Sequence, residues 1–126
     1  MKRVTGIGGI FFKARDPAGL SAWYRDHLGL DVGAWNGAIF HWGGAASEAG
    51  MTIWSPFAAD TDYMAPSTSP FMINFRVADL DALLAALRAE GCNVLDKTQA
   101  SEQGTFGWVI DPEGNKVELW EPPAGA

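Results

Sequence analysis

The chain has 126 residues, of which 48% are hydrophobic and 19% charged, a balance typical of a single globular domain rather than a disordered chain. Its formal net charge is −6 and its nine basic residues are scattered. This distribution argues against nucleic-acid binding, which needs a concentrated positive surface. No apolar run is long enough to span a membrane, and glycines interrupt the one near the start, so we expect a cytoplasmic protein without membrane contact. Cys92 is the only cysteine, which excludes an internal disulfide, and its apolar surroundings predict a buried thiol.

Six tryptophans and seven phenylalanines are more aromatic surface than a core of this size requires. Some of these rings are therefore expected to line a ligand pocket, because ligand sites favour aromatic walls. The alternative is that all of them lie in the core or in a dimer interface.

The first half of the chain begins with an apolar strand-like run over 8–14. Asp16 suits the N-cap of a helix, Pro17 its first position and Gly29 the position just after its end, so a helix is predicted over 17–28. Four large apolar residues recur in it at helical spacing and predict an apolar stripe: Leu20, Trp23, Tyr24 and Leu28. Three short strands are predicted after the helix, over Leu30–Val32, Ala38–Trp42 and Met51–Trp54.

The second half repeats this order after a segment rich in proline and short polar residues. A strand over Phe71–Val77 precedes Asp79, which suits an N-cap, and a helix is predicted from there through Glu90, ended by Gly91. Its apolar stripe is Leu80, Leu83, Leu84 and Leu87. Further strands are predicted over Asn93–Asp96, Thr105–Ile110 and Lys116–Trp120, and the turn sequence Asp111–Asn115 makes the last two a hairpin.

The two predicted N-caps lie half a chain length apart, and each half has the order β-α-β-β-β. We therefore expect one domain over 1–126 that contains two such modules. Module one covers about 1–57, the linker about 58–70 and module two about 71–122.

Five segments carry a resemblance to a known superfamily: Phe11–Pro17, Trp23–Leu30, Ile73–Leu80, Phe106–Asn115 and Lys116–Pro122. Together with the duplicated module, they resemble the vicinal oxygen chelate superfamily, which includes glyoxalase I, extradiol dioxygenases, fosfomycin resistance enzymes and bleomycin-binding resistance proteins. The resemblance implies an α+β fold in which two tandem βαβββ modules form a curled mixed sheet, with helices outside and a central pocket inside. It says little about the reaction, because one fold hosts many chemistries.

Alternation of side chains along strands then divides the residues between the two faces of the sheet. The helix side is expected to hold Ile10, Phe12, Ile73, Phe75, Val77, Val117 and Leu119. The pocket side is expected to hold Gly9, Phe11, Thr52, Trp54, Met72, Asn74, Arg76, Trp108, Glu118 and Trp120. A slip of one residue would invert this assignment in a strand.

In metal-dependent members of the superfamily, four strands each supply one ligand. Carried over strand by strand, the resemblance places these positions at Gly9, Thr52, Met72 and Glu118. Only Glu118 is a good ligand for a divalent ion, because glycine has no donor and the other two offer an un-ionised hydroxyl and a soft thioether. We therefore expect neither a metal nor another cofactor.

Three polar residues besides Glu118 are candidates for the site. His41 could face the pocket and form an acid–base pair with Glu118, although a structural role is the alternative. Glu118 could accept a proton or pair with Arg76. Arg76 and Asn74 could hold a carboxylate or carbonyl of a ligand, or Arg76 could form a salt bridge at the pocket mouth.

The sequence therefore predicts a metal-free protein that binds a small, partly planar molecule. The residues expected to contact it are Phe11, Thr52, Trp54, Met72, Asn74, Arg76, Trp108 and Trp120. The alternative is an isomerase, lyase or hydrolase that uses Glu118, with or without His41, for proton transfer, and a metal-dependent enzyme is a further one. The resemblance also implies a homodimer, because open sheet edges are commonly covered by pairing.

Overall fold

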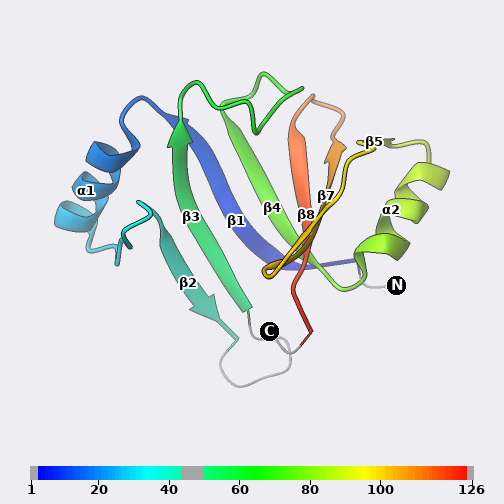
Figure 1. The fold of residues 1–126 in the computed structure, drawn as a ribbon, viewed down its shortest axis with the longest axis horizontal. Coiled ribbons are helices and arrows are strands. Elements are labelled where there is room, and N and C mark those ends of the chain that lie inside the picture. Colours follow the sequence, from blue (N-terminus) through cyan, green and yellow to red (C-terminus); the bar gives the residue numbers. More distant parts are fainter. Residues whose placement is uncertain (1–2, 44–49, 125–126) are drawn as a thin grey trace.

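A computed structural model describes residues 3–43 and 50–124 and has the predicted α+β architecture (Figure 1). One helix lies at each side of a curled mixed sheet. The elements are β1 (Val4–Ala14), α1 (Pro17–Leu28), β2 (Ala38–Trp42), β3 (Gly50–Ala58), β4 (Phe71–Val77), α2 (Leu80–Ala89), β5 (Asn93–Val94), β6 (Gln99–Ser101), β7 (Gly104–Ile110) and β8 (Lys116–Glu121).

The pairing of the strands shows the duplication directly. The sheet order is β2-β3-β1-β4-β8-β7-β5, and β6 pairs with β7 beside this path. In the first half β1 runs parallel to β3, which pairs antiparallel with β2, and in the second half β4, β8 and β7 repeat this arrangement. The first strands of the two halves, β1 and β4, pair antiparallel and join the halves into one sheet.

The predicted strand over Leu30–Val32 is wrong, because the structure has no strand there. The backbone bonds locally instead: the N–H of Val32 donates to the carbonyl of Leu30, and that of Gly33 donates to Gly37. The second half does have the corresponding strand, β5, although β5 ends at Val94 rather than at the predicted Asp96.

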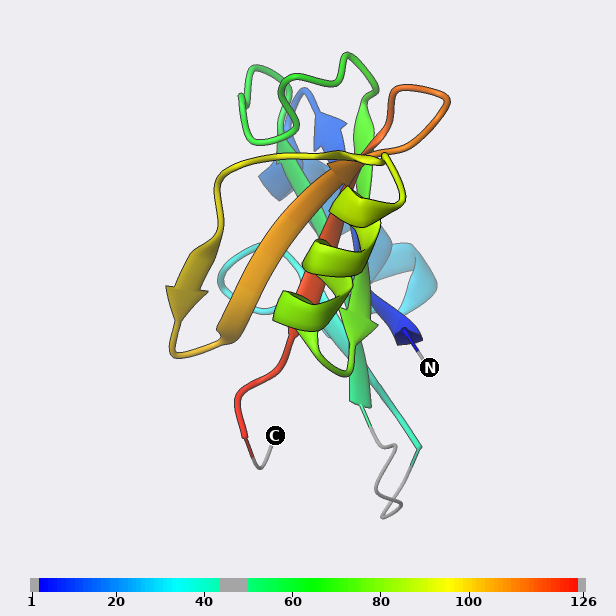
Figure 2. The ribbon, with the colours of Figure 1, turned by 90° about the vertical axis from the view of Figure 1, so that its right-hand side faces the viewer.

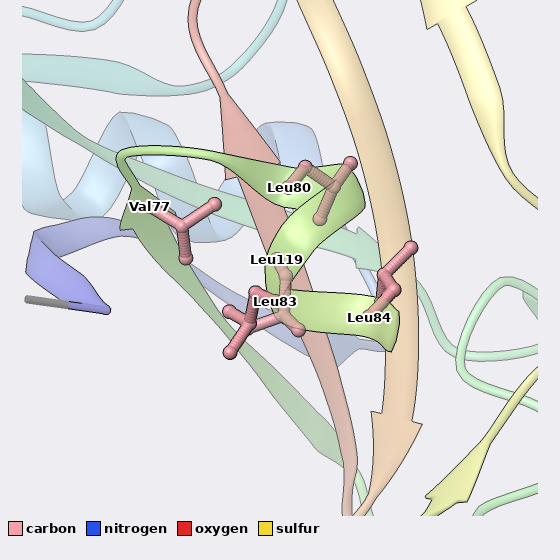
Figure 3. Packing of buried hydrophobic residues seen from close by; sticks show 5 residues of the cluster. All are labelled: Val77, Leu80, Leu83, Leu84 and Leu119. Atoms are coloured by element: carbon pink, nitrogen blue, oxygen red, sulfur yellow. The ribbon is translucent and has the colours of Figure 1, made fainter. Parts of the chain in front are cut away.

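Helix α2 buries its predicted stripe. The side chain of Asp79 accepts a hydrogen bond from the N–H of Ala82 at 3.1 Å and caps the helix, as predicted. Leu80, Leu83 and Leu84 pack with strand residues (Figure 3), and the whole cluster is Val77, Leu80, Leu83, Leu84 and Leu119. Seen from the side in Figure 2, α2 lies across one face of the second half of the sheet. This cluster is therefore the main apolar core of module two.

Helix α1 has the predicted limits but a more exposed stripe. Asp16 caps it by accepting from the N–H of Gly19, and Gly29 ends it with a φ of 72°. However, Trp23 is 50% exposed and Leu28 is 60% exposed, so part of the predicted stripe is not buried. The stripe packs on the sheet through Tyr24, whose ring lies 4.7 Å from that of Trp54.

The turn between β7 and β8 forms as predicted. Oδ1 of Asp111 accepts hydrogen bonds from the backbone N–H groups of Glu113 and Asn115, both at 2.9 Å, and the flanking strands pair antiparallel. These bonds hold the pKa of Asp111 below its usual value, the contribution of Asn115 being the largest.

Cys92 is exposed, so the prediction of a buried thiol is wrong. It follows Gly91, which ends α2 with a φ of 82°, and its N–H donates to the carbonyl of Leu87. Cys92 therefore belongs to the turn that closes the helix, where the chain leaves the core. No helix among the described residues is long and apolar enough to cross a membrane.

Candidate functional site

A cavity of about 300 Å³ lies on the face of the sheet that the helices leave free. Side chains in β8 alternate between the two faces: Val117 and Leu119 pack toward α2, whereas Glu118 and Trp120 line the cavity. Its lining is mostly apolar and consists of Gly8, Phe11, Ile39, Met51, Ile53, Asn74, Gln103, Phe106, Glu118, Trp120 and Pro123. Glu118 is the only ionisable residue in this set.

Three side chains hold the carboxylate of Glu118, which is only 2% exposed. The hydroxyl of Tyr63 donates to Oε2 at 2.6 Å, and the indole N–H of Trp108 donates to the same oxygen at 2.9 Å. The amide N–H of Asn74 donates to Oε1 at 2.7 Å. A buried carboxylate needs such hydrogen bonds, and here all three donors are electrically neutral. The negative charge is thus fixed in position by groups that do not cancel it.

Tyr63 is positioned to stay protonated. Burial raises its pKa, and the adjacent carboxylate of Glu118 raises it further. Its hydroxyl therefore donates a hydrogen bond to Glu118 throughout the neutral pH range.

Lys116 lies on the other side of Tyr63. Its Nζ donates to the backbone carbonyl of Tyr63 at 2.7 Å and lies 5.3 Å and 5.1 Å from the ring centres of Tyr63 and Trp108. Burial lowers the pKa of Lys116, while the charge of Glu118 acts in the opposite direction. Lys116 is not part of the cavity lining, and its ammonium group lies against the rings of Tyr63 and Trp108.

Asn74 brings an unused acceptor to the cavity. It is 3% exposed, and its Oδ1 is the only buried side-chain nitrogen or oxygen in the described residues that lacks a hydrogen-bond partner. A Cβ atom at Gly8 would collide with this oxygen, so the absence of a side chain there makes room for it. Oδ1 of Asn74 and Oε1 of Glu118 therefore form a polar floor that accepts hydrogen bonds.

Of the residues predicted to contact a ligand, Phe11, Asn74 and Trp120 line the cavity beside Glu118. Met72 and Trp108 lie in a core cluster with Met64 and are almost completely buried. Met72 therefore packs in the core next to the cavity and does not line it. Trp108 contacts Glu118 through its hydrogen bond from the core side.

Arg76 lies outside the cavity lining. Its guanidinium group is 6.0 Å from the ring centre of Trp42. Of the two residues considered for holding a carboxylate or carbonyl, only Asn74 therefore lines the cavity.

Thr52 and Trp54 lie on the wrong face for the pocket. Trp54 packs against Phe12 and Tyr24 on the α1 side, and the hydroxyl of Thr52 accepts from the indole N–H of Trp42 at 3.0 Å. In β3 it is Met51 and Ile53 that line the cavity. An error of one residue in assigning the faces of β3 places every side chain of the strand on the opposite face.

The strand register explains this error. Glu118 pairs with Asn74, and the equivalent of Asn74 in module one is Phe11, which pairs with Ser55. Ser55 is therefore the counterpart of Glu118, three residues after Thr52. Because side chains alternate along a strand and three is an odd number, Thr52 and Ser55 lie on opposite faces of β3.

The structure does not bring His41 and Glu118 together. His41 is exposed on β2, and three strands, β3, β1 and β4, separate β2 from β8. Although Ile39 of the same strand lines the cavity, His41 is therefore not among the residues that border it with Glu118.

A family model described as the glyoxalase-like domain matches residues 9–120, which is most of the chain. The chain belongs to the glyoxalase-like family. No curated protein matches the sequence.

Solved structures share the fold of this glyoxalase-like protein. A methylmalonyl-CoA epimerase variant from Streptomyces coelicolor in complex with 2-nitronate-propionyl-CoA is 21% identical, with a TM-score of 0.70 over 96% of this chain and 99% of that one. The methylmalonyl-CoA epimerase of Mycobacterium tuberculosis is 20% identical, with a TM-score of 0.59 over 94% and 89%. A glyoxalase/bleomycin resistance protein/dioxygenase superfamily member from Vibrio splendidus 12B01 is 12% identical, with a TM-score of 0.60 over 91% and 97%.

The residues of this glyoxalase-like protein do not fit the metal centre that its superfamily implies. Of the four ligand positions, Met72 is buried in the core and Thr52 lies on the other face. Oε2 of Glu118 already accepts two hydrogen bonds. In the part of the chain that the structure describes, no three His, Cys, Asp or Glu side chains are grouped to hold an ion.

Several residues of the site were not predicted from the sequence. Tyr63 lies in the predicted linker, where no periodicity marks it, and Gln103 lies in the turn between β6 and β7. Met51 and Ile53 were missed through the face error in β3, although their alternation with Thr52 and Trp54 was visible. The unpredicted cavity residues are Gly8, Ile39, Met51, Ile53, Gln103, Phe106 and Pro123.

Proposed function

We propose that this glyoxalase-like protein binds a small, partly planar organic molecule in the cavity above Glu118 and does so without a catalytic metal. The observation that carries the proposal is one buried carboxylate at the floor of a mostly apolar cavity. Ligand sites combine apolar walls with a few fixed polar groups, and about 300 Å³ is within their usual range. Phe11, Phe106 and Trp120 supply aromatic walls against which a flat molecule can stack.

A panel of small aromatic molecules tests the proposal, with binding measured by calorimetry and thermal shift. Ile53→Trp should fill the cavity and abolish the binding of every ligand that the wild type binds. Glu118→Gln should weaken those ligands that contact the floor, whereas Glu113→Gln, in the exposed β7–β8 turn, should change nothing. Ligands whose affinity ignores both Ile53→Trp and Glu118→Gln would place the site elsewhere.

A second candidate function is proton transfer by Glu118, as an isomerase, lyase or hydrolase requires. The observation in its favour is that Oε1 accepts a side-chain hydrogen bond from Asn74 and belongs to a residue of the cavity lining. A carboxylate held in this way can accept a proton from a bound molecule. Exchange of a ligand's acidic C–H for deuterium, followed by NMR, tests this function. Glu118→Gln should abolish the exchange, and His41→Ala should leave it unchanged.

The metal-free part of the proposal has its own test. The protein, purified without chelators, should contain no stoichiometric nickel, zinc, manganese or iron by elemental analysis. A full equivalent of any of these metals would overturn it and favour a metal-dependent enzyme.

We also propose that the protein is a cytoplasmic homodimer. Support for the dimer comes from module one, which leaves large apolar side chains uncovered: Trp23, Leu28 and Trp35 are each about half exposed or more. Exposed apolar groups of this size commonly mark an interaction surface. Light scattering after size-exclusion chromatography should give twice the mass of one chain, and Trp23→Glu should return it to the mass of the monomer.

A further inference from the structure

We infer that the ligand of this cavity presents a positively charged nitrogen, a primary ammonium group, to Glu118 and Asn74. This inference rests on the proposed function and names its ligand class. It departs from the sequence-based expectation that Asn74 helps to hold a carboxylate or carbonyl.

The first argument is the balance of hydrogen-bond donors and acceptors at the floor. Tyr63 and Trp108 each use their single side-chain donor on Oε2, and the amide of Asn74 uses one of its two N–H groups on Oε1. The floor also contains Oδ1 of Asn74, buried and without a partner, next to a carboxylate oxygen that accepts one such bond. These two acceptors favour a ligand that donates. Among the described side chains of the lining, a ligand carboxylate or carbonyl would find only neutral donors, the second amide N–H of Asn74 and the amide of Gln103.

The second argument is charge. The lining contains the carboxylate of Glu118 and no Lys, Arg or His among the described residues. The nearby cations lie outside the lining: Lys116 faces the rings of Tyr63 and Trp108 from behind, and Arg76 lies over Trp42. An ammonium group would form charge-assisted hydrogen bonds with the floor, whereas an anion would be repelled in a poorly solvated site.

The third argument is the shape and chemistry of the walls. Phe106 and Trp120 stack on one another, with ring centres 6.5 Å apart, and together with Phe11 they border the cavity. Aromatic faces attract cations and accommodate flat apolar groups. At about 30 Å³ per water-sized group, the cavity has room for roughly ten non-hydrogen atoms. An arylalkyl ammonium ion of about that size fits the walls and the floor together.

Three probes that differ only in their polar end test the inference: phenethylamine, phenethyl alcohol and 3-phenylpropanoate. Calorimetry at about pH 7, where the amine is protonated, should give an affinity for phenethylamine about ten-fold above that for the alcohol. The carboxylate should bind more weakly than the alcohol. Glu118→Gln should reduce phenethylamine to the affinity of the alcohol, whereas Glu113→Gln should preserve the order of the three probes.

The outcomes separate this inference from the proposed function. If the alcohol or the carboxylate binds as tightly as the amine, and Ile53→Trp abolishes that binding, the ammonium inference is overturned while the cavity remains the site. If none of the probes and no member of the wider aromatic panel binds, both are overturned. Circular dichroism checks that Glu118→Gln is folded, and if it is not, the order of the three probes on the wild-type protein still decides.

Discussion

Trp108 and Glu118 are direct partners across β7 and β8, and the indole N–H of Trp108 donates to Oε2 of Glu118 at 2.9 Å. Both side chains are at most 3% exposed. The register of a regular hairpin thus places the donor beside the carboxylate. Because the turn at Asp111–Asn115 sets that register, a local turn sequence also fixes the geometry of the site.

Trp108→Phe should destabilise the protein, because it keeps an aromatic ring but removes one hydrogen bond from a buried carboxylate. We expect the free energy of unfolding to fall by about 1.5–3 kcal/mol, the range for hydrogen bonds to charged groups. Urea unfolding followed by circular dichroism measures the loss. Phe40→Leu, at a position that is 50% exposed, is the control and should have little effect. Equal stability of the two variants would mean that Glu118 does not depend on the indole.

Tyr63→Phe should change how stability depends on alkaline pH. The pKa of Tyr63 is raised by burial and then by Glu118, so the folded protein keeps the phenol proton above the ordinary value of 10.0 while the unfolded chain loses it. The raised pKa of Tyr63 therefore stabilises the folded protein fully below pH 10.0, and this stabilisation declines as the pH rises above 10.0. Urea unfolding from about pH 8 to about pH 11 should therefore show a steeper loss for the wild type than for Tyr63→Phe. Parallel curves would show that Tyr63 titrates alike in both states.

Gly8→Ala should damage the floor of the cavity. The new Cβ would collide with Oδ1 of Asn74 and lie 3.0 Å from the ring of Trp120. We expect a loss of stability of about 1–3 kcal/mol from overpacking and a clear loss of affinity for ligands of the cavity.

Gly107→Ala provides the comparison for Gly8→Ala. Its Cβ would meet the methyl groups of Leu84 at 2.9 Å on the opposite face. This variant should lose stability without losing affinity. A Gly8→Ala protein that binds ligands as tightly as the wild type would show that ligand binding does not depend on the floor formed with Asn74.

The two helices should differ in what they contribute to stability. Leu83→Ala in α2 removes a side chain that is 4% exposed and should lower the free energy of unfolding by about 2–5 kcal/mol. In the monomer obtained with Trp23→Glu, Leu28→Ala in α1, at a position 60% exposed, should change it by less than about 0.5 kcal/mol. Chemical unfolding compares the two directly. A large loss at Leu28 in this monomer would show that Leu28 is buried within one chain.

The fold was largely predictable because its signals are local. Asp16 and Asp79 each accept the capping hydrogen bond that their side-chain chemistry favours, and Gly29 adopts the left-handed conformation that ends a helix. The duplication followed from the repetition of these signals. The apolar residues over 30–32 were misleading, because a short apolar segment has strand propensity whether or not a neighbouring strand is available.

The site was only partly predictable because it depends on register and on a connection. Period two places Glu118 and Trp120 on one face of β8, but it cannot place β3 beside β1, and the faces of Thr52 and Trp54 were therefore inverted. Nothing periodic marks Tyr63, whose hydroxyl reaches a carboxylate 55 residues later in the chain.

The segment between β3 and β4 does more than connect the two modules. It contributes Tyr63 to the carboxylate and Met64, fully buried, to the cluster beneath the cavity. Two proteins with identical strands but different connections between β3 and β4 would give Glu118 different hydrogen-bond partners. Ligand selection in this fold can therefore diverge through a stretch of chain that belongs to neither half of the repeat, while the duplicated framework stays unchanged.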